Sequence, residues 1–201
     1  MKAVLFDLDG VLVESVDVWL SAFNDTLREL GLPSISREEF IKKHWGKSTV
    51  ENFRSMGLGM EAVLRCWRKY LDRLHEIKLF PASKKVLREV RKKYKTALVT
   101  NTPKQGVESL LRRLGILDSF DLIVTGDDVR EGKPSPEIVL LACERLGISP
   151  AEALLVGDTQ SDVEAGRRAG CRVVGIGIEA DFTIKNIAEL EPLLARVDPC
   201  T

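Results

Sequence analysis

Two aspartates stand one residue apart at the end of an apolar run near the start of the chain. The run from Ala3 to Phe6 leads directly into Asp7 and Asp9. An uninterrupted apolar run of this kind is typical of a strand buried on both faces of a parallel sheet. Because open α/β sheets bind ligands outside the carboxyl ends of their strands, the two carboxylates are candidates for metal binding and catalysis. The pair alone leaves open that one caps a turn and the other is solvated.

Three more polar clusters follow later runs that also have the composition of strands. Thr100 and Asn101 offer a hydroxyl and an amide for an anionic oxygen, Lys133 lies on a Gly-Lys-Pro turn, and Asp158 and Asp162 follow the fourth run. Each cluster alone also has a structural explanation. Thr-Asn is common in turns, a lysine before proline is usually exposed, and Asp158 could cap a helix.

These clusters, brought to one crevice, would unite four carboxylates and one ammonium group. Unit charges about 4 Å apart repel by several kcal/mol even at an effective dielectric constant near 20. We therefore expect a cation among them, and hard oxygen ligands favour Mg²⁺, which binds through a few carboxylates and a substrate phosphate. The combination indicates phosphoryl transfer.

Five short apolar runs are predicted to form the sheet that positions these groups. Segments with helical periodicity separate the last four runs, which is the alternation expected of a parallel sheet with crossover helices. The runs are Ala3 to Phe6, Ala97 to Thr100, Leu122 to Thr125, Ala153 to Val156 and Arg172 to Ile176. We therefore expect an α/β fold with a Rossmann-like parallel sheet.

A long insertion separates the first two predicted strands. The gap of roughly 90 residues far exceeds the dozen or more that a βαβ crossover needs. Within it, apolar residues recur at helical spacing, as Trp19 and Phe23 do. We expect residues 15–80 to form a small helical domain whose aromatic residues are its core, and residues 1–14 and 81–201 to form the catalytic core domain.

Composition argues against several classes of function. Lys and Arg number 30, as do Asp and Glu, so no net charge would attract nucleic acid or an anionic membrane. The four cysteines form no CxxC pair and cluster with neither histidine, which disfavours zinc and favours a reducing compartment. No run approaches the ~20 apolar residues of a membrane span, and the first residues lack a signal-peptide pattern. We expect a cytoplasmic protein, monomeric or homodimeric, that acts on a small phosphorylated metabolite.

In their order along the chain, the motifs resemble those of the haloacid dehalogenase superfamily, in the branch with a helical cap after the first strand. They are FDLDGVL at 6–12, VTNT at 99–102, GKPSPE at 132–137 and GDTQSD at 157–162. The resemblance covers nearly the whole chain. It implies a Rossmann-like core domain, a cap domain and a Mg²⁺-dependent enzyme.

The resemblance also implies a role for each polar residue. Asp7 would be the nucleophile that forms an aspartyl-phosphate, and Asp9 would be the general acid and then the general base. The side chain of Asp7, the backbone carbonyl of Asp9 and Asp158 would hold Mg²⁺, with Asp162 as a direct or indirect ligand. The groups that would bind the phosphoryl oxygens are Thr100, Asn101 and Lys133, of which Lys133 would also offset the carboxylates.

Asp9 and the fourth motif narrow the reaction. Dehalogenases and phosphonatases of the superfamily lack an acid at the position of Asp9, whereas phosphatases and phosphomutases keep it because an alkoxide leaving group needs a proton. Members similar to β-phosphoglucomutase carry Glu where this chain has Gly157. The pattern of this chain is closer to that of phosphoglycolate phosphatases. We expect a phosphatase for a phosphoglycolate-like or sugar phosphate. The alternatives are a phosphomutase and a non-catalytic protein that binds a phosphorylated ligand.

Substrate specificity is expected to reside in the cap. The segment from His44 to Ser48 is a polar break between helical stretches, at the place where cap residues of related enzymes reach the leaving group. There His44 or Lys47 could pair with a carboxylate or a second phosphate. The alternative is that Lys47 is solvated and His44 ends a helix.

Overall fold

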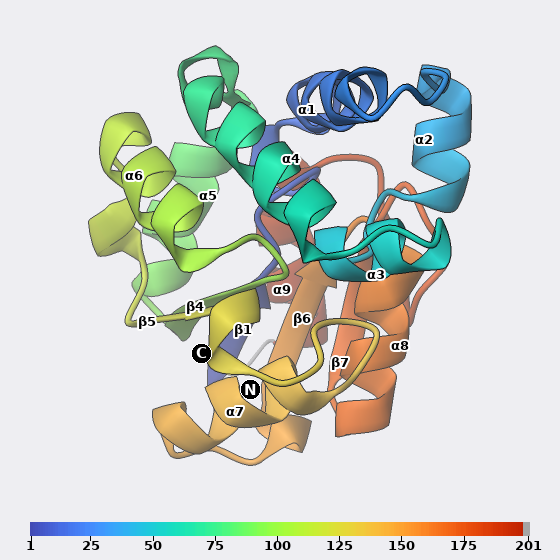
Figure 1. The fold of residues 1–201 in the computed structure, drawn as a ribbon. Helices are drawn as coiled ribbons and strands as arrows, with labels where there is room; N and C mark the ends of the chain where they lie inside the picture. The colour runs from blue at the N-terminus through green and yellow to red at the C-terminus, as the bar shows by residue number, and fades with distance from the viewer. Residues whose placement is uncertain (199–201) are drawn as a thin grey trace.

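The computed structural model describes residues 1–198, and its centre is a parallel sheet with helices on both faces (Figure 1). The strand order is β5-β4-β1-β6-β7-β8, and every neighbouring pair is parallel. The strands are β1 (Ala3–Phe6), β4 (Lys95–Thr100), β5 (Leu122–Thr125), β6 (Ala153–Gly157), β7 (Arg172–Ile176) and β8 (Phe182–Ile184). The five predicted strands and the α/β fold are confirmed. The edge strand β8 was not predicted, because three residues are too few for a periodic pattern.

The three central strands end at the same edge of the sheet. Phe6 of β1 pairs in register with Leu98 of β4 on one side and with Val156 of β6 on the other. The residues that follow these three strands therefore emerge at the same edge of the sheet. That edge is where the candidate site lies.

Both faces of the sheet carry apolar side chains, and helices cover both faces. Along β1, Val4 and Phe6 join one apolar cluster, and Ala3 and Leu5 join the other. The first cluster is covered by α5 (Ser83–Arg91), α6 (Lys104–Leu114) and α9 (Leu190–Val197), and the second by α7 (Glu137–Leu146) and α8 (Gln160–Ala169). None of the helices within residues 1–198 is long and apolar enough to cross a membrane.

Four more helices lie in the insertion after β1, at the top of Figure 1. They are α1 (Val16–Glu29), α2 (Arg37–Lys43), α3 (Thr49–Ser55) and α4 (Met60–Asp72). The chain leaves and re-enters through a two-stranded antiparallel ribbon of β2 (Val13–Glu14) and β3 (Lys78–Leu79). We propose that residues 15–80 are the cap domain and that 1–14 and 81–201 are the core domain. The two share one continuous apolar cluster, to which Phe23 of α1 and Val63 of α4 both belong.

Short turns and buried cysteines complete the described part of the chain. Single 3₁₀ turns lie at Leu74–Glu76, Leu117–Ser119, Gly126–Asp128, Pro150–Glu152 and Ile187–Glu189. Cys66, Cys143 and Cys171 are buried free thiols. Cys200, the fourth cysteine in the compartment prediction, lies outside the described residues.

Candidate active site

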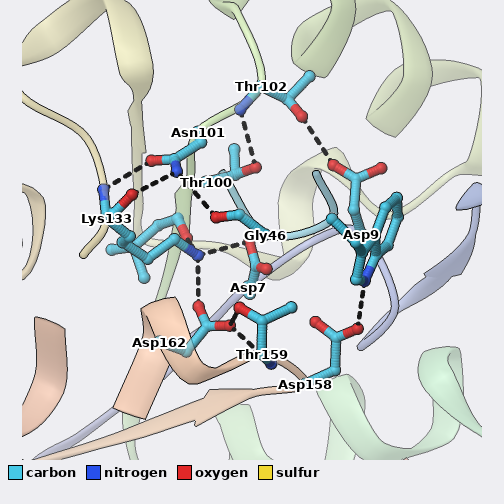
Figure 2. Close-up of polar contacts among 12 residues, drawn as sticks. Asp7, Asp9, Gly46, Thr100, Asn101, Thr102, Lys133, Asp158, Thr159 and Asp162 are labelled. Atoms are coloured by element: carbon cyan, nitrogen blue, oxygen red, sulfur yellow. Dashed lines mark hydrogen bonds and ion pairs between the residues drawn. The ribbon is translucent and has the colours of Figure 1, made fainter. Parts of the chain in front are cut away.

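Three predicted acids converge at the carboxyl edge of the sheet (Figure 2). Asp7 follows β1, Asp158 follows β6, and Asp162 lies in the first turn of α8. One carboxylate oxygen from each lies within 4.8 Å of the other two. Asp162 is fully buried, and its Oδ2 accepts hydrogen bonds from the Thr159 backbone N–H at 3.1 Å and from Thr159 Oγ1 at 2.6 Å. This capping box starts α8 and fixes Asp162 in place.

The ammonium group of Lys133 lies between Asp7 and Asp162, as Figure 2 shows. Its ammonium nitrogen is 2.8 Å from Asp7 Oδ1 and 2.6 Å from Asp162 Oδ1, and it donates to the Val99 carbonyl at 3.0 Å. The side chain is only 3% exposed. Three acceptors therefore match the three N–H groups of the lysine.

The amide of Asn101 holds the loop that carries Lys133. Asn101 Oδ1 accepts from the Lys133 backbone N–H at 2.8 Å, and Nδ2 donates to the carbonyls of Lys133 at 2.9 Å and Gly46 at 3.4 Å. Thr100 is buried behind it, and its hydroxyl oxygen accepts from the Thr102 N–H at 3.2 Å. The structure thus brings both residues to the predicted place and gives their side chains protein partners.

Burial and mutual repulsion disfavour ionisation of the acids. Burial raises the pKa of Asp7 to about 7, an effect that Lys133 opposes and the charges of Asp162 and Asp9 reinforce. Burial, followed by the charges of Asp162 and Asp7, raises the pKa of Asp158 well above its usual value. Although burial disfavours the ammonium form of Lys133, Asp162 and Asp7 hold its pKa above the usual value. The lysine alone does not neutralise the cluster.

Asp9 is enclosed by three hydrogen-bond donors that the sequence did not reveal. Its Oδ1 accepts from Ser15 Oγ at 2.5 Å and from Trp19 Nε1 at 3.1 Å, and its Oδ2 accepts from Thr102 Oγ1 at 2.7 Å. Trp19 was predicted to be cap core. Its ring does stack on Tyr70, with ring centroids 3.8 Å apart, but its N–H faces Asp9. The requirement that a buried indole N–H find an acceptor was the one sequence clue to this contact.

The loop after α2 connects the cap directly to the acidic cluster. Trp45 Nε1 donates to Asp158 Oδ2 at 2.9 Å. At Gly46, whose φ is +80°, a Cβ would lie 2.6 Å from Thr159 Oγ1. A glycine is therefore needed for the loop to approach the core this closely. Trp45 lies within the segment predicted from sequence, but no role was predicted for it.

A small cavity lies between the cap loop and the acidic cluster. Its volume is about 60 Å³. Asp7 and Asp158 of the acidic cluster line it together with the cap residues His44 and Lys47. His44 also ends α2, and Lys47 Nζ is 4.0 Å from a carboxylate oxygen of Glu51.

Comparison with known proteins identifies the family. Residues 4–176 match the model of the haloacid dehalogenase-like hydrolases. The chain belongs to this family. A phosphoglycolate phosphatase of Chromobacterium violaceum is 34% identical to it over 215 residues, with 96% of each chain covered. Pyrophosphatase PpaX of Bacillus mycoides is 30% identical, with 98% of this chain and 99% of the relative covered. CbbY of Rhodobacter sphaeroides, solved in complex with phosphate, has a TM-score of 0.83 at 28% identity, over 94% of this chain and 96% of CbbY.

The acidic cluster of this haloacid dehalogenase-like chain fits a divalent cation. Asp158 Oδ1 is buried and has no hydrogen-bond partner, while Oδ2 of the same carboxylate is bonded to Trp45. A buried, unpaired carboxylate oxygen costs free energy unless a donor or a cation compensates it. With Asp7 and Asp162 beside it, the donor set consists of hard oxygen ligands, which suit Mg²⁺. The family assignment and a site able to hold a metal agree with the expectation from sequence.

Proposed function

We propose that this chain is a Mg²⁺-dependent phosphatase that hydrolyses a small phosphomonoester through an aspartyl-phosphate on Asp7. The observation that carries the proposal is the position of Asp7. It lies between the ammonium group of Lys133 and the unpaired oxygen of Asp158, on the sheet edge that also bears Asp9. The names of the relatives, a phosphoglycolate phosphatase and a pyrophosphatase, support the same chemistry.

Asp7 supplies the attacking oxygen. Lys133 holds Oδ1, and no hydrogen bond from residues 1–198 reaches Oδ2. Oδ2 forms the bond to phosphorus as the ester bond between phosphorus and the leaving oxygen breaks. Asp9 gives a proton to the leaving oxygen, then takes one from the water that attacks the phosphorus of the aspartyl-phosphate. The products are an alcohol and inorganic phosphate, and Asp7 is regenerated.

Lys133 acts on the phosphoryl group through its charge. Its three N–H groups are directed at Asp7, Asp162 and Val99, so the lysine stabilises charge without a free donor to the substrate. Asn101 is a positioning residue, because its amide binds both the N–H and the carbonyl of Lys133. These roles refine the prediction that both side chains bind the phosphoryl oxygens directly.

The metal would be held by Asp7, Asp158 and the backbone carbonyl of Asp9. When bound, Mg²⁺ would offset the charge of the carboxylates and of the phosphoryl oxygens. Asp162 is hydrogen-bonded to Lys133 and Thr159, and it would hold Lys133 in position beside Asp7. His44 and Lys47 would meet the leaving group from the cap side.

The test is phosphate release from a panel of phosphomonoesters with Mg²⁺ and with EDTA. The panel includes phosphoglycolate, nitrophenyl phosphate, sugar phosphates and pyrophosphate, and Asp7→Asn is the control variant. We expect metal-dependent release that the variant lacks, together with acid-stable labelling of the wild type by ³²P-phosphate. Transfer of phosphate within a sugar phosphate, dependent on a bisphosphate activator and with little release, would show a phosphomutase. Binding without either reaction would indicate a non-catalytic role.

A further inference from the structure

A buried side-chain amide in the cap makes its hydrogen bonds to one histidine. Asn52 of α3 is 5% exposed. Its Nδ2 donates to the backbone carbonyl of His44 at 2.9 Å, and its Oδ1 lies 3.0 Å from His44 Nδ1. Burying an amide costs free energy unless its polar atoms are bonded, and here the carbonyl and the amino group both bind the same residue. Asn52 therefore fixes the position and the ring orientation of His44.

The same two hydrogen bonds determine which ring nitrogen of His44 carries the proton. A backbone carbonyl can only accept, so the Nδ2 group of Asn52 must face it. The Oδ1 atom then faces His44 Nδ1 and can only accept, so Nδ1 must donate. In the neutral imidazole, the other nitrogen, Nε2, is left with a lone pair and is a hydrogen-bond acceptor.

That lone pair has no protein partner. No residue between 1 and 198 makes a hydrogen bond to His44 Nε2, and in this part of the chain the atom is not among the buried unpaired ones. It therefore reaches open space, and His44 lines the cavity of the candidate site. The ring also packs against two phenylalanines, with Phe23 4.9 Å and Phe40 6.2 Å from it between ring centroids.

The residues that line the cavity indicate what could bind between His44 and the acidic cluster. A small leaving group would lie with its ester oxygen toward Asp9 and its far end toward His44. That far end meets aromatic rings, the lone pair of His44 Nε2 and the side chain of Lys47, which also lines the cavity.

We propose that His44 Nε2 accepts a hydrogen bond from a hydroxyl group on the leaving alcohol, so that the substrates are monophosphates of small glycols or polyols. A carboxylate at this point would set an acceptor against the lone pair of the neutral imidazole. The inference rests on the proposed phosphatase function and separates this chain from an enzyme for phosphoglycolate. It also replaces the expectation that His44 pairs with an anion.

The first test is long-range ¹H–¹⁵N NMR of the two histidines, with His75→Gln used to assign the signals. We expect the Nδ1–H tautomer for neutral His44, and loss of that preference in Asn52→Leu. The control is Asn24→Leu, since Asn24 binds the N–H and carbonyl of Ile35 in the same two-bond manner but does not line the cavity. Addition of 2-hydroxyethyl phosphate to Asp7→Asn protein should shift Nε2, and ethyl phosphate should not. An Nε2–H tautomer, or no difference between the two esters, overturns the proposal.

The second test compares three esters that differ only at the far end of the leaving group. We expect kcat/KM for 2-hydroxyethyl phosphate to exceed that for ethyl phosphate by about 10-fold, the value of one net hydrogen bond. This ratio should fall to near one in His44→Phe and in Asn52→Leu and should stay unchanged in Asn24→Leu. A wild-type preference for phosphoglycolate, or a ratio that survives His44→Phe, refutes the proposal.

Failure of the proposed function would have a different signature. If no ester is hydrolysed, the phosphatase proposal fails, but the NMR shifts still test the hydrogen bond to His44. If all three esters are hydrolysed at similar rates, the phosphatase proposal stands and the substrate class does not.

Discussion

Removing the charge of Asp7 is predicted to stabilise the metal-free protein. The folded structure raises the pKa of this carboxyl group from 3.8 to about 7, chiefly through burial. At about pH 8 the ionised form therefore costs the folded state on the order of 4 kcal/mol relative to the unfolded chain. Asp7→Asn keeps the shape and the acceptor for Lys133 while it removes the charge. We expect the variant to be more stable than the wild type in EDTA.

The difference in stability between Asp7→Asn and the wild type depends on pH because folding raises the pKa of Asp7. Between the two pKa values the folded state binds more protons than the unfolded state, so wild-type stability falls as pH rises. At about pH 5 folded Asp7 is protonated, and the advantage of Asp7→Asn should shrink to roughly 2 kcal/mol. For a chain of this length, 1 kcal/mol shifts the Tm by about 2–4 °C. The expected gain in Tm is therefore roughly 10 °C at the higher pH and less than half of that at the lower.

The assay is thermal unfolding of both proteins in EDTA across this pH range, followed by the same series with Mg²⁺. The metal should stabilise the wild type more than the variant, since the ion offsets the charge that the variant lacks. A wild type that is more stable than Asp7→Asn at the higher pH in EDTA would refute the reasoning. So would an advantage of the variant that does not depend on pH.

Three further substitutions test other parts of the site. Trp45→Phe removes the donor to Asp158 and should weaken Mg²⁺ binding by about 10-fold in calorimetry, the lower end of the range for residues that orient metal ligands; unchanged affinity would contradict that role. Asp162→Ala leaves Lys133 with one carboxylate partner and should lower stability by about 3 kcal/mol, opposite in sign to Asp7→Asn; a Tm equal to that of the wild type would contradict it. Asp9→Asn should slow alkyl phosphates more than nitrophenyl phosphate, whose leaving group needs little protonation, and equal losses would show that Asp9 is not the acid.

The parts of the fold that could be predicted from sequence are those fixed by local composition. β1, β4 and β6 are buried on both faces, so each reads as a continuous apolar run, and the polar residue after each run belongs to the sheet edge. The acidic cluster could be predicted because Asp7 and Asp158 follow such runs directly. The capping box that places Asp162 is also local, since it links residues three apart in the chain.

Contacts between the insertion and the core could not be predicted in the same way. Trp45 and Asp158 are 113 residues apart, and nothing in either local sequence indicates that an indole from the cap reaches a carboxylate of the core. Thr102 and Ser15 likewise reach Asp9 only through the packing of α1 and the loop after β4. The prediction for Asn101 was incomplete for the same reason. The loop that its amide holds lies 32 residues further along the chain.

The hydrogen-bond donors around Asp9 determine how this carboxyl group gains and loses a proton in the proposed reaction. The indole N–H of Trp19 can only donate, whereas the hydroxyls of Ser15 on Oδ1 and Thr102 on Oδ2 can each turn from donor to acceptor. Each oxygen of Asp9 therefore has a partner that can adapt when the carboxyl group gains or loses its proton. Because this one carboxyl group serves the departing alcohol and then the incoming water, the alcohol has to leave before hydrolysis begins.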